Sequence, residues 1–138
     1  MSNYIADTHA LLWYLTDDNR LSKDANLIFE QTEKGEHLII VPTIVLVESL
    51  DVIEKKRVAY DFDLVLQAIE DNENYIIWDL DIEVVNQMIK IKNVPELHDR
   101  IIVAIAKLCD AGLITKDGEI TDAKEVKTKW KSRTSINK

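Results

Sequence analysis

Four acidic residues lie within apolar stretches or directly after them, and this placement constrains the fold more than any other feature of the chain. They are Asp7, Glu48, Asp99 and Asp117. An ionised carboxylate is costly to bury alone, so such groups are usually paired, protonated or bound to metal. At an effective dielectric of about 20, like charges ~4 Å apart repel by ~4 kcal/mol, so a converged cluster would hold protons or recruit a divalent cation. Oxygen-only ligands favour Mg²⁺ or Mn²⁺ over zinc.

The length of the chain sets the expected domain organisation. The chain has 138 residues, of which 46% are apolar, with only three Gly and two Pro. We expect a single helix-rich domain over residues 1–131, followed by a basic tail over 132–138. The longest nearly apolar run, 38–47, is shorter than the ~20 residues that span a bilayer. With Cys109 as the only cysteine, no intrachain disulfide can form, which favours a cytoplasmic protein without a membrane partner.

The net charge of −8 is unevenly distributed. Residues 124–138 carry +5 and residues 1–123 carry −13, and a second basic group is Lys55-Lys56-Arg57. An acidic body argues against a nucleic-acid partner. The basic tail has two interpretations, a solvated terminus or a segment that contacts phosphate.

The pattern of apolar residues predicts strands that alternate with helices. Strands are expected at 3–6, 38–41, 75–78 and 113–115, with a possible fifth around 126–130. Helices are expected at 8–16, 21–34, 43–56, 61–71, 81–92 and 95–110. Ser22 is a candidate N-cap, Gly35 and Gly112 are candidate helix stops, and Pro95 suits the first position of a helix. We therefore expect an α/β fold: a three-layer α/β/α sandwich around a central parallel sheet of four or five strands.

This topology would bring the four carboxylates to one edge of the sheet. Asp7 follows the first expected strand and Asp117 follows the fourth. Glu48 falls in the second turn of the helix after the second strand, and Asp99 in the first turn of the helix that leads to the fourth. Reactive residues of parallel sheets gather at the carboxyl ends of the strands. The sequence therefore permits a single acidic site.

Four segments that contain these residues resemble the PIN domain family, and most closely its VapC-like toxin nucleases. The opening Asp7-Thr8-His9-Ala10-Leu11-Leu12-Trp13 resembles a start frequent in one branch of that family, and Val47-Glu48-Ser49-Leu50 resembles its acidic helix. His98-Asp99-Arg100-Ile101-Ile102-Val103-Ala104 and Leu113-Ile114-Thr115-Lys116-Asp117 resemble its third and fourth acidic blocks. The resemblance spans residues 3 to about 131. It implies a metal-dependent ribonuclease that is often a dimer and is often held inactive by an antitoxin peptide.

The expected chemistry is hydrolysis of RNA phosphodiester bonds with Mg²⁺ or Mn²⁺. Divalent ions activate water, neutralise phosphate charge and assist the departing alkoxide. We assign Asp7 and Asp99 to the metal, with Glu48 and Asp117 completing or orienting the shell. Thr8 and Thr115 are candidates to hydrogen-bond the carboxylates, and Arg100 is a candidate phosphate ligand.

The sequence departs from the family pattern at one place. Where this branch commonly reads Asp-Pro-x-Asp-Arg, the chain has Glu96-Leu97-His98-Asp99-Arg100. We expect the change to alter the start of the helix rather than the chemistry, and it leaves the substrate preference open.

Each assignment has a structural competitor. Asp7 and Asp99 suit helix N-termini, Asp117 before Gly118 suits a turn, and Glu48 could face solvent. The three Trp residues are typical of a core, and the three His residues are scattered.

Three other functions are suggested by parts of the sequence. Asp79-Leu80-Asp81 after an expected strand is similar to the start of haloacid-dehalogenase-type phosphatases, but too few residues follow for that fold, and Asp81 suits an N-cap. A domain that binds RNA or a partner with an idle acidic site is the non-enzymatic alternative, and an RNA-processing nuclease without an antitoxin is the enzymatic one.

Overall fold

The computed structural model describes residues 2–116 and 126–130 and contains one five-stranded sheet. The strands are β1 (Ser2–Ala6), β2 (His37–Pro42), β3 (Tyr75–Trp78), β4 (Gly112–Ile114) and β5 (Thr128–Lys129). The helices are α1 (Thr8–Leu15), α2 (Lys23–Glu33), α3 (Thr43–Glu54), α4 (Phe62–Glu70), α5 (Ile82–Met88) and α6 (Leu97–Leu108). The predicted α/β class is confirmed, and the possible fifth strand is present as β5.

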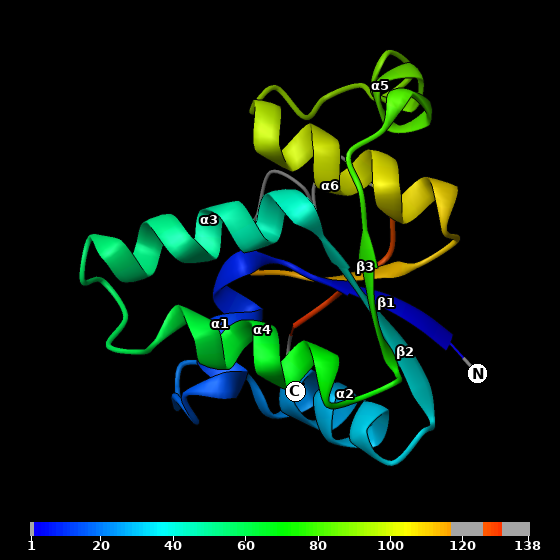
Figure 1. Cartoon of the computed structure of the whole chain (residues 1–138). Coiled ribbons are helices and arrows are strands. Elements are labelled where there is room, and N and C mark those ends of the chain that lie inside the picture. The colour runs from blue at the N-terminus through cyan, green and yellow to red at the C-terminus, as the bar shows by residue number, and fades with distance from the viewer. Residues whose placement is uncertain (1, 117–125, 131–138) are drawn as a thin grey trace, which may run out of the picture.

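All neighbouring strands run parallel, in the order β3-β2-β1-β4-β5. β1 lies at the centre, with Ile5 opposite Ile40 of β2 and Leu113 of β4. α1 and α2 lie on one side of the sheet and α5 and α6 on the other (Figure 1). Because parallel strands share one direction, their carboxyl ends form a single edge, and the residues after β1 and β4 meet there.

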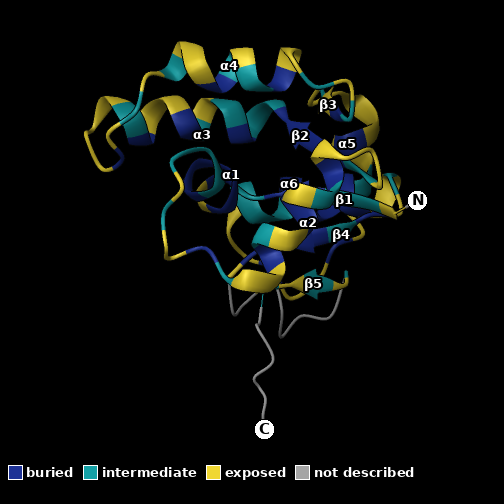
Figure 2. Ribbon diagram, turned by 90° about the horizontal axis from the view of Figure 1, so that it is seen from below, coloured by how far each residue is buried: buried dark blue, intermediate teal, exposed yellow. Residues whose placement is uncertain are grey.

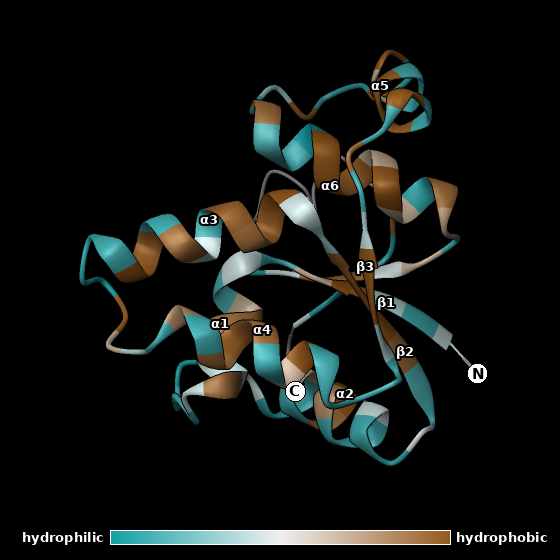
Figure 3. Cartoon of the chain, in the orientation of Figure 1, coloured by the Kyte–Doolittle hydropathy of each residue, from teal (hydrophilic) through white to brown (hydrophobic). Residues whose placement is uncertain are grey.

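The core lies between the central strands and the helices that cover them. Ile5, Ile39, Val41, Leu113 and Ile114 are completely buried. Figure 2 shows buried residues along these strands, and Figure 3 shows that the same strands are hydrophobic. Runs that are apolar on both faces are the expected composition of strands covered by helices on both sides.

Capping side chains set the helix starts that the sequence predicted. Ser22 Oγ accepts a hydrogen bond from Ala25 N at 3.1 Å, and Asp81 Oδ1 accepts one from Val84 N at 3.1 Å. Gly35 follows α2 with a φ of +84°, a left-handed conformation that glycine adopts readily.

Two predicted boundary signals were wrong around α6. Pro95 does not occupy the first helical position, because Glu96 is the N-cap and α6 begins at Leu97. Gly112 does not close α6, which ends at Leu108; Asp110 adopts the left-handed conformation with a φ of +49°, and Gly112 belongs to β4. A Cβ on Gly112 would lie 3.2 Å from the Tyr4 ring, so close packing in the sheet accounts for this glycine.

α5 is shorter than predicted. It ends at Met88 rather than Lys92, and Asn93 has a φ of +66°. The predicted tail over 132–138 lies outside the described residues. In residues 2–116 and 126–130, no helix has the length and apolar character needed to cross a membrane.

We predict that Ile5→Ala lowers the free energy of unfolding by about 2–5 kcal/mol, because it opens a cavity between buried strands. The matched control is Ile82→Ala, which truncates the same side chain where it is 70% exposed and should change stability by less than about 0.5 kcal/mol. Chemical denaturation measures both values. Equal losses for the two variants would contradict this placement of the core.

Candidate functional site

A cavity of about 560 Å³ lies at the carboxyl edge of the sheet and contains three of the four predicted carboxylates. Asp7, Glu48 and Asp99 line it, from three different elements. All three residues are half-buried. We call this the acidic cavity. Carboxylates that are distant in sequence therefore line one space, as the topology predicted.

Asp7 is anchored between β1, β4 and α1. Its backbone N–H donates to Ile114 O at 3.2 Å, and its carbonyl accepts from Leu11 N at 3.0 Å. Its Oδ1 accepts from Ala10 N at 3.0 Å, so the capping role proposed as a competitor is present. A cap uses one carboxylate oxygen, and capping alone does not account for the presence of Glu48 and Asp99 around the same cavity.

Glu48 points from α3 toward α1 and α6 rather than into open solvent. Its Oε1 accepts a hydrogen bond from Thr8 Oγ1 at 2.8 Å, and its Oε2 lies 3.1 Å from His98 Nδ1. Its side chain is 28% exposed. The carboxylate is held by one group from each neighbouring helix, and the contact with His98 is an ion pair whenever the imidazole is protonated.

Asp99 lies in the first turn of α6, but it is not the cap of that helix. Glu96 Oε1 accepts from Asp99 N at 3.0 Å and takes that role. The macrodipole favours a negative charge at this position. Glu96 Oε2 also lies 3.7 Å from His98 Nδ1. The departure from the family pattern at Glu96-Leu97 thus provides the helix cap beside the acidic cavity.

The donor chemistry of the cavity suits a hard divalent cation. Carboxylate oxygens are the ligands that Mg²⁺ and Mn²⁺ prefer. Among residues 2–116 and 126–130, however, no group of three or more His, Cys, Asp or Glu residues is arranged so that it could hold a metal ion. Asp117, the fourth predicted ligand, lies outside the described residues.

Of the other three predicted site residues, Thr8 lines the acidic cavity, whereas Thr115 and Arg100 do not. Thr8 is buried and contacts Glu48 directly. Thr115 is buried directly after β4, and it does not line the acidic cavity. Arg100 is not brought to the cavity either, because its Nη2 donates to Met88 O at 2.6 Å, beside α5.

Sequence reasoning missed His98 as part of the site. It set the histidines aside as too scattered for a metal site, yet His98 contacts Glu48 and lines the acidic cavity. Arg57 and Asp51 line it as well. The position of His98 directly before Asp99 was the available signal, but its partner on α3 is distant in sequence.

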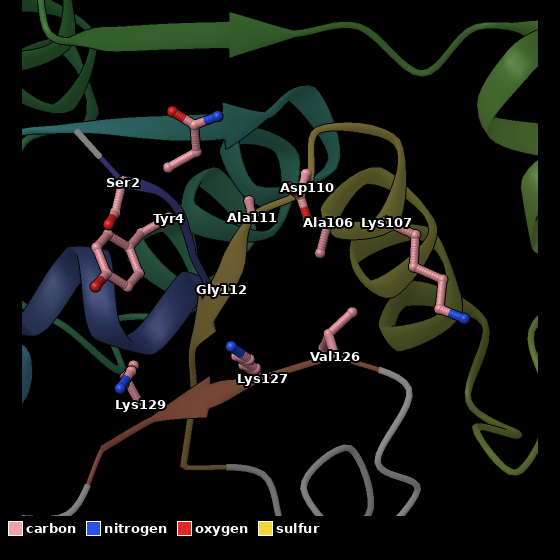
Figure 4. Close-up of a pocket in the computed structure, with 11 residues that line it drawn as sticks. Ser2, Tyr4, Ala106, Lys107, Asp110, Ala111, Gly112, Val126, Lys127 and Lys129 are labelled. Atoms are coloured by element: carbon pink, nitrogen blue, oxygen red, sulfur yellow. The ribbon is translucent and has the colours of Figure 1, made fainter.

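A larger cavity of about 810 Å³ lies at the opposite, amino edge of the sheet. Residues at the starts of β1 and β4 and at the end of α6 line it, together with Lys127 and Lys129 (Figure 4). Among the described residues that line this cavity, Asp110 is the only one with a carboxylate. Size alone therefore does not identify the site, because Asp7, Glu48 and Asp99 line the cavity at the other edge.

The phosphatase-like pair is also accounted for. Asp81 caps α5 through Val84 N, and β3, which precedes Asp79, is an edge strand of the sheet. Both aspartates are exposed and neither lines the acidic cavity.

Known proteins place this fold in a family. The PIN domain family matches residues 4–126. No curated protein matches the sequence significantly. The solved structure of VapBC2 from Rickettsia felis, bound to a promoter DNA fragment, matches with a TM-score of 0.70 and 15% identity over 94% of this chain and 99% of that chain.

Two further solved structures are similar. A toxin–antitoxin complex from Klebsiella pneumoniae has a TM-score of 0.63 and 17% identity, over 89% of this chain and 94% of that chain. VapC20 of Mycobacterium tuberculosis, described as a sarcin-ricin loop cleaving toxin, has a TM-score of 0.63 and 14% identity, over 90% and 98%. At these identities the likeness concerns the fold. The family match covers most of the sequence, and the chain therefore belongs to the PIN domain family.

Proposed function

We propose that the protein is a metal-dependent endoribonuclease that hydrolyses phosphodiester bonds of single-stranded RNA, and that it is the toxin of a type II toxin–antitoxin pair. The observation that carries the proposal is the presence of Asp7, Glu48 and Asp99 on one cavity at the carboxyl edge of the sheet. The similar mycobacterial protein is described as a toxin that cleaves the sarcin-ricin loop, which also supports the proposal of a toxin nuclease.

Different residues of the cavity would bind the metal ion, orient a carboxylate and contact the phosphate. Asp7, Glu48 and Asp99, together with Asp117, would hold Mg²⁺ or Mn²⁺. A bound divalent ion would supply activation of water, charge neutralisation at the phosphate and stabilisation of the leaving alkoxide. Thr8 and His98 fix the two oxygens of Glu48, so that this carboxylate is oriented before a ligand arrives. Arg57 lines the same cavity and carries a positive charge that suits a phosphate.

Two alternatives use the same fold. An RNA-processing nuclease would cleave RNA but would lack a partner antitoxin. A binding domain with an idle acidic site would show metal-independent affinity for RNA and no product. A cleavage assay on a mixed RNA pool, titrated with Mg²⁺ and Mn²⁺ and followed by sequencing of the ends, separates the binding domain from both nucleases.

We predict that Asp7→Asn and Asp99→Asn each reduce metal-dependent cleavage of single-stranded RNA by more than about 100-fold, beyond the usual effect of losing an outer contact. Asn is also a good N-cap, so Asp7→Asn should keep α1 intact. The matched control is Asp81→Asn, which alters an equivalent cap on α5 and should retain full activity. Cleavage by Asp7→Asn at the wild-type rate, or cleavage that persists in the presence of a chelator, would contradict the metal-binding roles of these aspartates.

We predict that Thr8→Val raises the Mn²⁺ concentration needed for half-maximal cleavage by roughly 10- to 100-fold, because Glu48 loses the hydrogen bond that orients it. Thr8→Ser keeps the hydroxyl and should stay near the wild-type value. A metal titration at fixed RNA concentration gives both midpoints. If the two variants behaved alike, the effect would come from packing of α1 and not from this hydrogen bond.

We predict that the protein co-purifies with the product of an adjacent small reading frame for a DNA-binding protein, as a complex containing two copies of this chain. An inhibitor that donates a basic residue to the acidic cavity would be attracted by the net charge of −13 on residues 1–123. Native mass measurement of the co-expressed pair gives the stoichiometry. A cleaving monomer that captures no such product would favour the RNA-processing alternative.

A further inference from the structure

A second, smaller cavity adjoins the acidic one. It has a volume of about 310 Å³ and is lined by Asp7, His9, Trp13, Lys116 and Trp130. Asp7 and His9 line both cavities, so the two spaces share a wall. We call the smaller one the aromatic cavity. Whatever occupies it therefore lies directly beside the acidic cavity.

Three rings from two distant parts of the chain form the aromatic cavity. The Trp13 ring lies 5.5 Å from the His9 ring and 5.9 Å from the Trp130 ring, between centroids. Trp13 is 7% exposed, and it therefore belongs to the core that underlies the cavity. His9 is exposed and Trp130 is half-buried. These two rings accordingly keep apolar surface available to a ligand.

Cationic groups surround these rings. Lys116 Nζ lies 5.7 Å from the Trp13 ring centroid, and the Arg20 guanidinium lies 4.7 Å from it. Arg20 is paired with Asp18 at 2.7 Å, and its hydrogen bonds lower the pKa of Asp18 to about 2. Lys116 is exposed and follows β4 at the carboxyl edge. It brings positive charge to the edge at which Asp7, Glu48 and Asp99 lie.

We propose that the aromatic cavity receives a nucleobase of single-stranded RNA next to the phosphate held at the acidic cavity, with Lys116 contacting the RNA backbone. The proposal rests on the ribonuclease function proposed above for the position of the phosphate. Unpaired bases are commonly recognised by stacking on aromatic side chains, including Trp and His. A volume near the lower limit for ligand sites, about 300 Å³, suits one planar group.

The experiment measures RNA binding without cleavage. A fluorescently labelled short single-stranded RNA of mixed sequence is titrated with the full chain in Ca²⁺, and its integrity is checked on a gel. We expect Trp130→Ala to weaken binding roughly 5- to 100-fold, as one base loses its stacking partner. Trp130→Phe keeps an aromatic face and should recover most of the affinity. Trp78→Ala is the matched control, because Trp78 is also half-buried and belongs to the opposite edge strand.

A second set of RNAs tests the stacked base itself. A single abasic nucleotide is moved along the RNA, and each version is titrated against wild type and Trp130→Ala. At one position the abasic change should weaken binding to wild type while leaving binding to Trp130→Ala unchanged, which is the coupling expected of two groups in contact. Equal weakening in both proteins at every position would overturn the proposal.

Lys116→Gln provides a test that does not disturb the core. It should weaken RNA binding and reduce its dependence on salt, because one phosphate contact is lost. Lys90→Gln, an exposed lysine after α5, should change neither. Wild-type affinity in both Trp130→Ala and Lys116→Gln would overturn the proposal.

The outcomes also separate this proposal from the nuclease assignment. Cleavage that depends on Asp7 and is unaffected by Trp130→Ala would leave the ribonuclease standing and remove the base subsite. RNA binding that depends on Trp130, with no cleavage in any metal, would keep the subsite and remove the hydrolase.

Discussion

The attachment of Asp7 to both the sheet and the first helix is the constraint on which the site depends. Its backbone joins β1 to β4 through Ile114 O, and its side chain and carbonyl begin α1 through Ala10 and Leu11. Because β1 is the central strand of a buried parallel sheet, the backbone of Asp7 cannot shift without disturbing the core, and the hydrogen bond from Ala10 N orients its carboxylate. The acidic cavity is therefore built around a fixed oxygen, and the carboxylates on α3 and α6 are positioned relative to it.

Glu48 is held by contacts with the two neighbouring helices α1 and α6. A carboxylate on a helix could rotate toward water, but the hydroxyl of Thr8 and the imidazole of His98 occupy its two oxygens. Half-burial strengthens each contact relative to open solvent. The same two groups hold the carboxylate at the wall of the cavity. A helix that would otherwise present an exposed acid thus contributes to a shared site.

Local signals were sufficient for most of the architecture. Apolar runs predicted the strands at 38–41 and 75–78, and side chains such as Ser22 and Asp81 predicted helix starts because capping is a local interaction. The parallel topology permitted Asp7, Glu48 and Asp99 to lie at one edge of the sheet, and all three line one cavity there. These features depend on neighbours in sequence or on the direction of whole strands.

Two of the predictions that failed involve contacts between residues distant in sequence, and one involves a competing helix cap close by. Glycine is a common residue at helix ends, but Gly112 lies in β4, where close packing against Tyr4 leaves little room for a side chain. Pro95 suits the first position of a helix, yet the Glu96 side chain accepts a hydrogen bond from Asp99 N, and α6 begins at Leu97, two residues later than predicted. His98 acquires its role only through Glu48, on a helix that no local pattern connects to it.

An acidic protein that binds RNA needs binding energy that does not come from net charge. The body carries −13 over residues 1–123, so long-range electrostatics oppose the approach of a polyanion. Bound cations would offset that repulsion at the acidic cavity, while Arg57 and Lys116 supply local positive charge at the same edge. Stacking of a base at the aromatic cavity, as proposed above, would add binding energy that does not come from charge neutralisation. An acidic surface and an RNA substrate are therefore compatible when recognition is concentrated at one edge of the sheet.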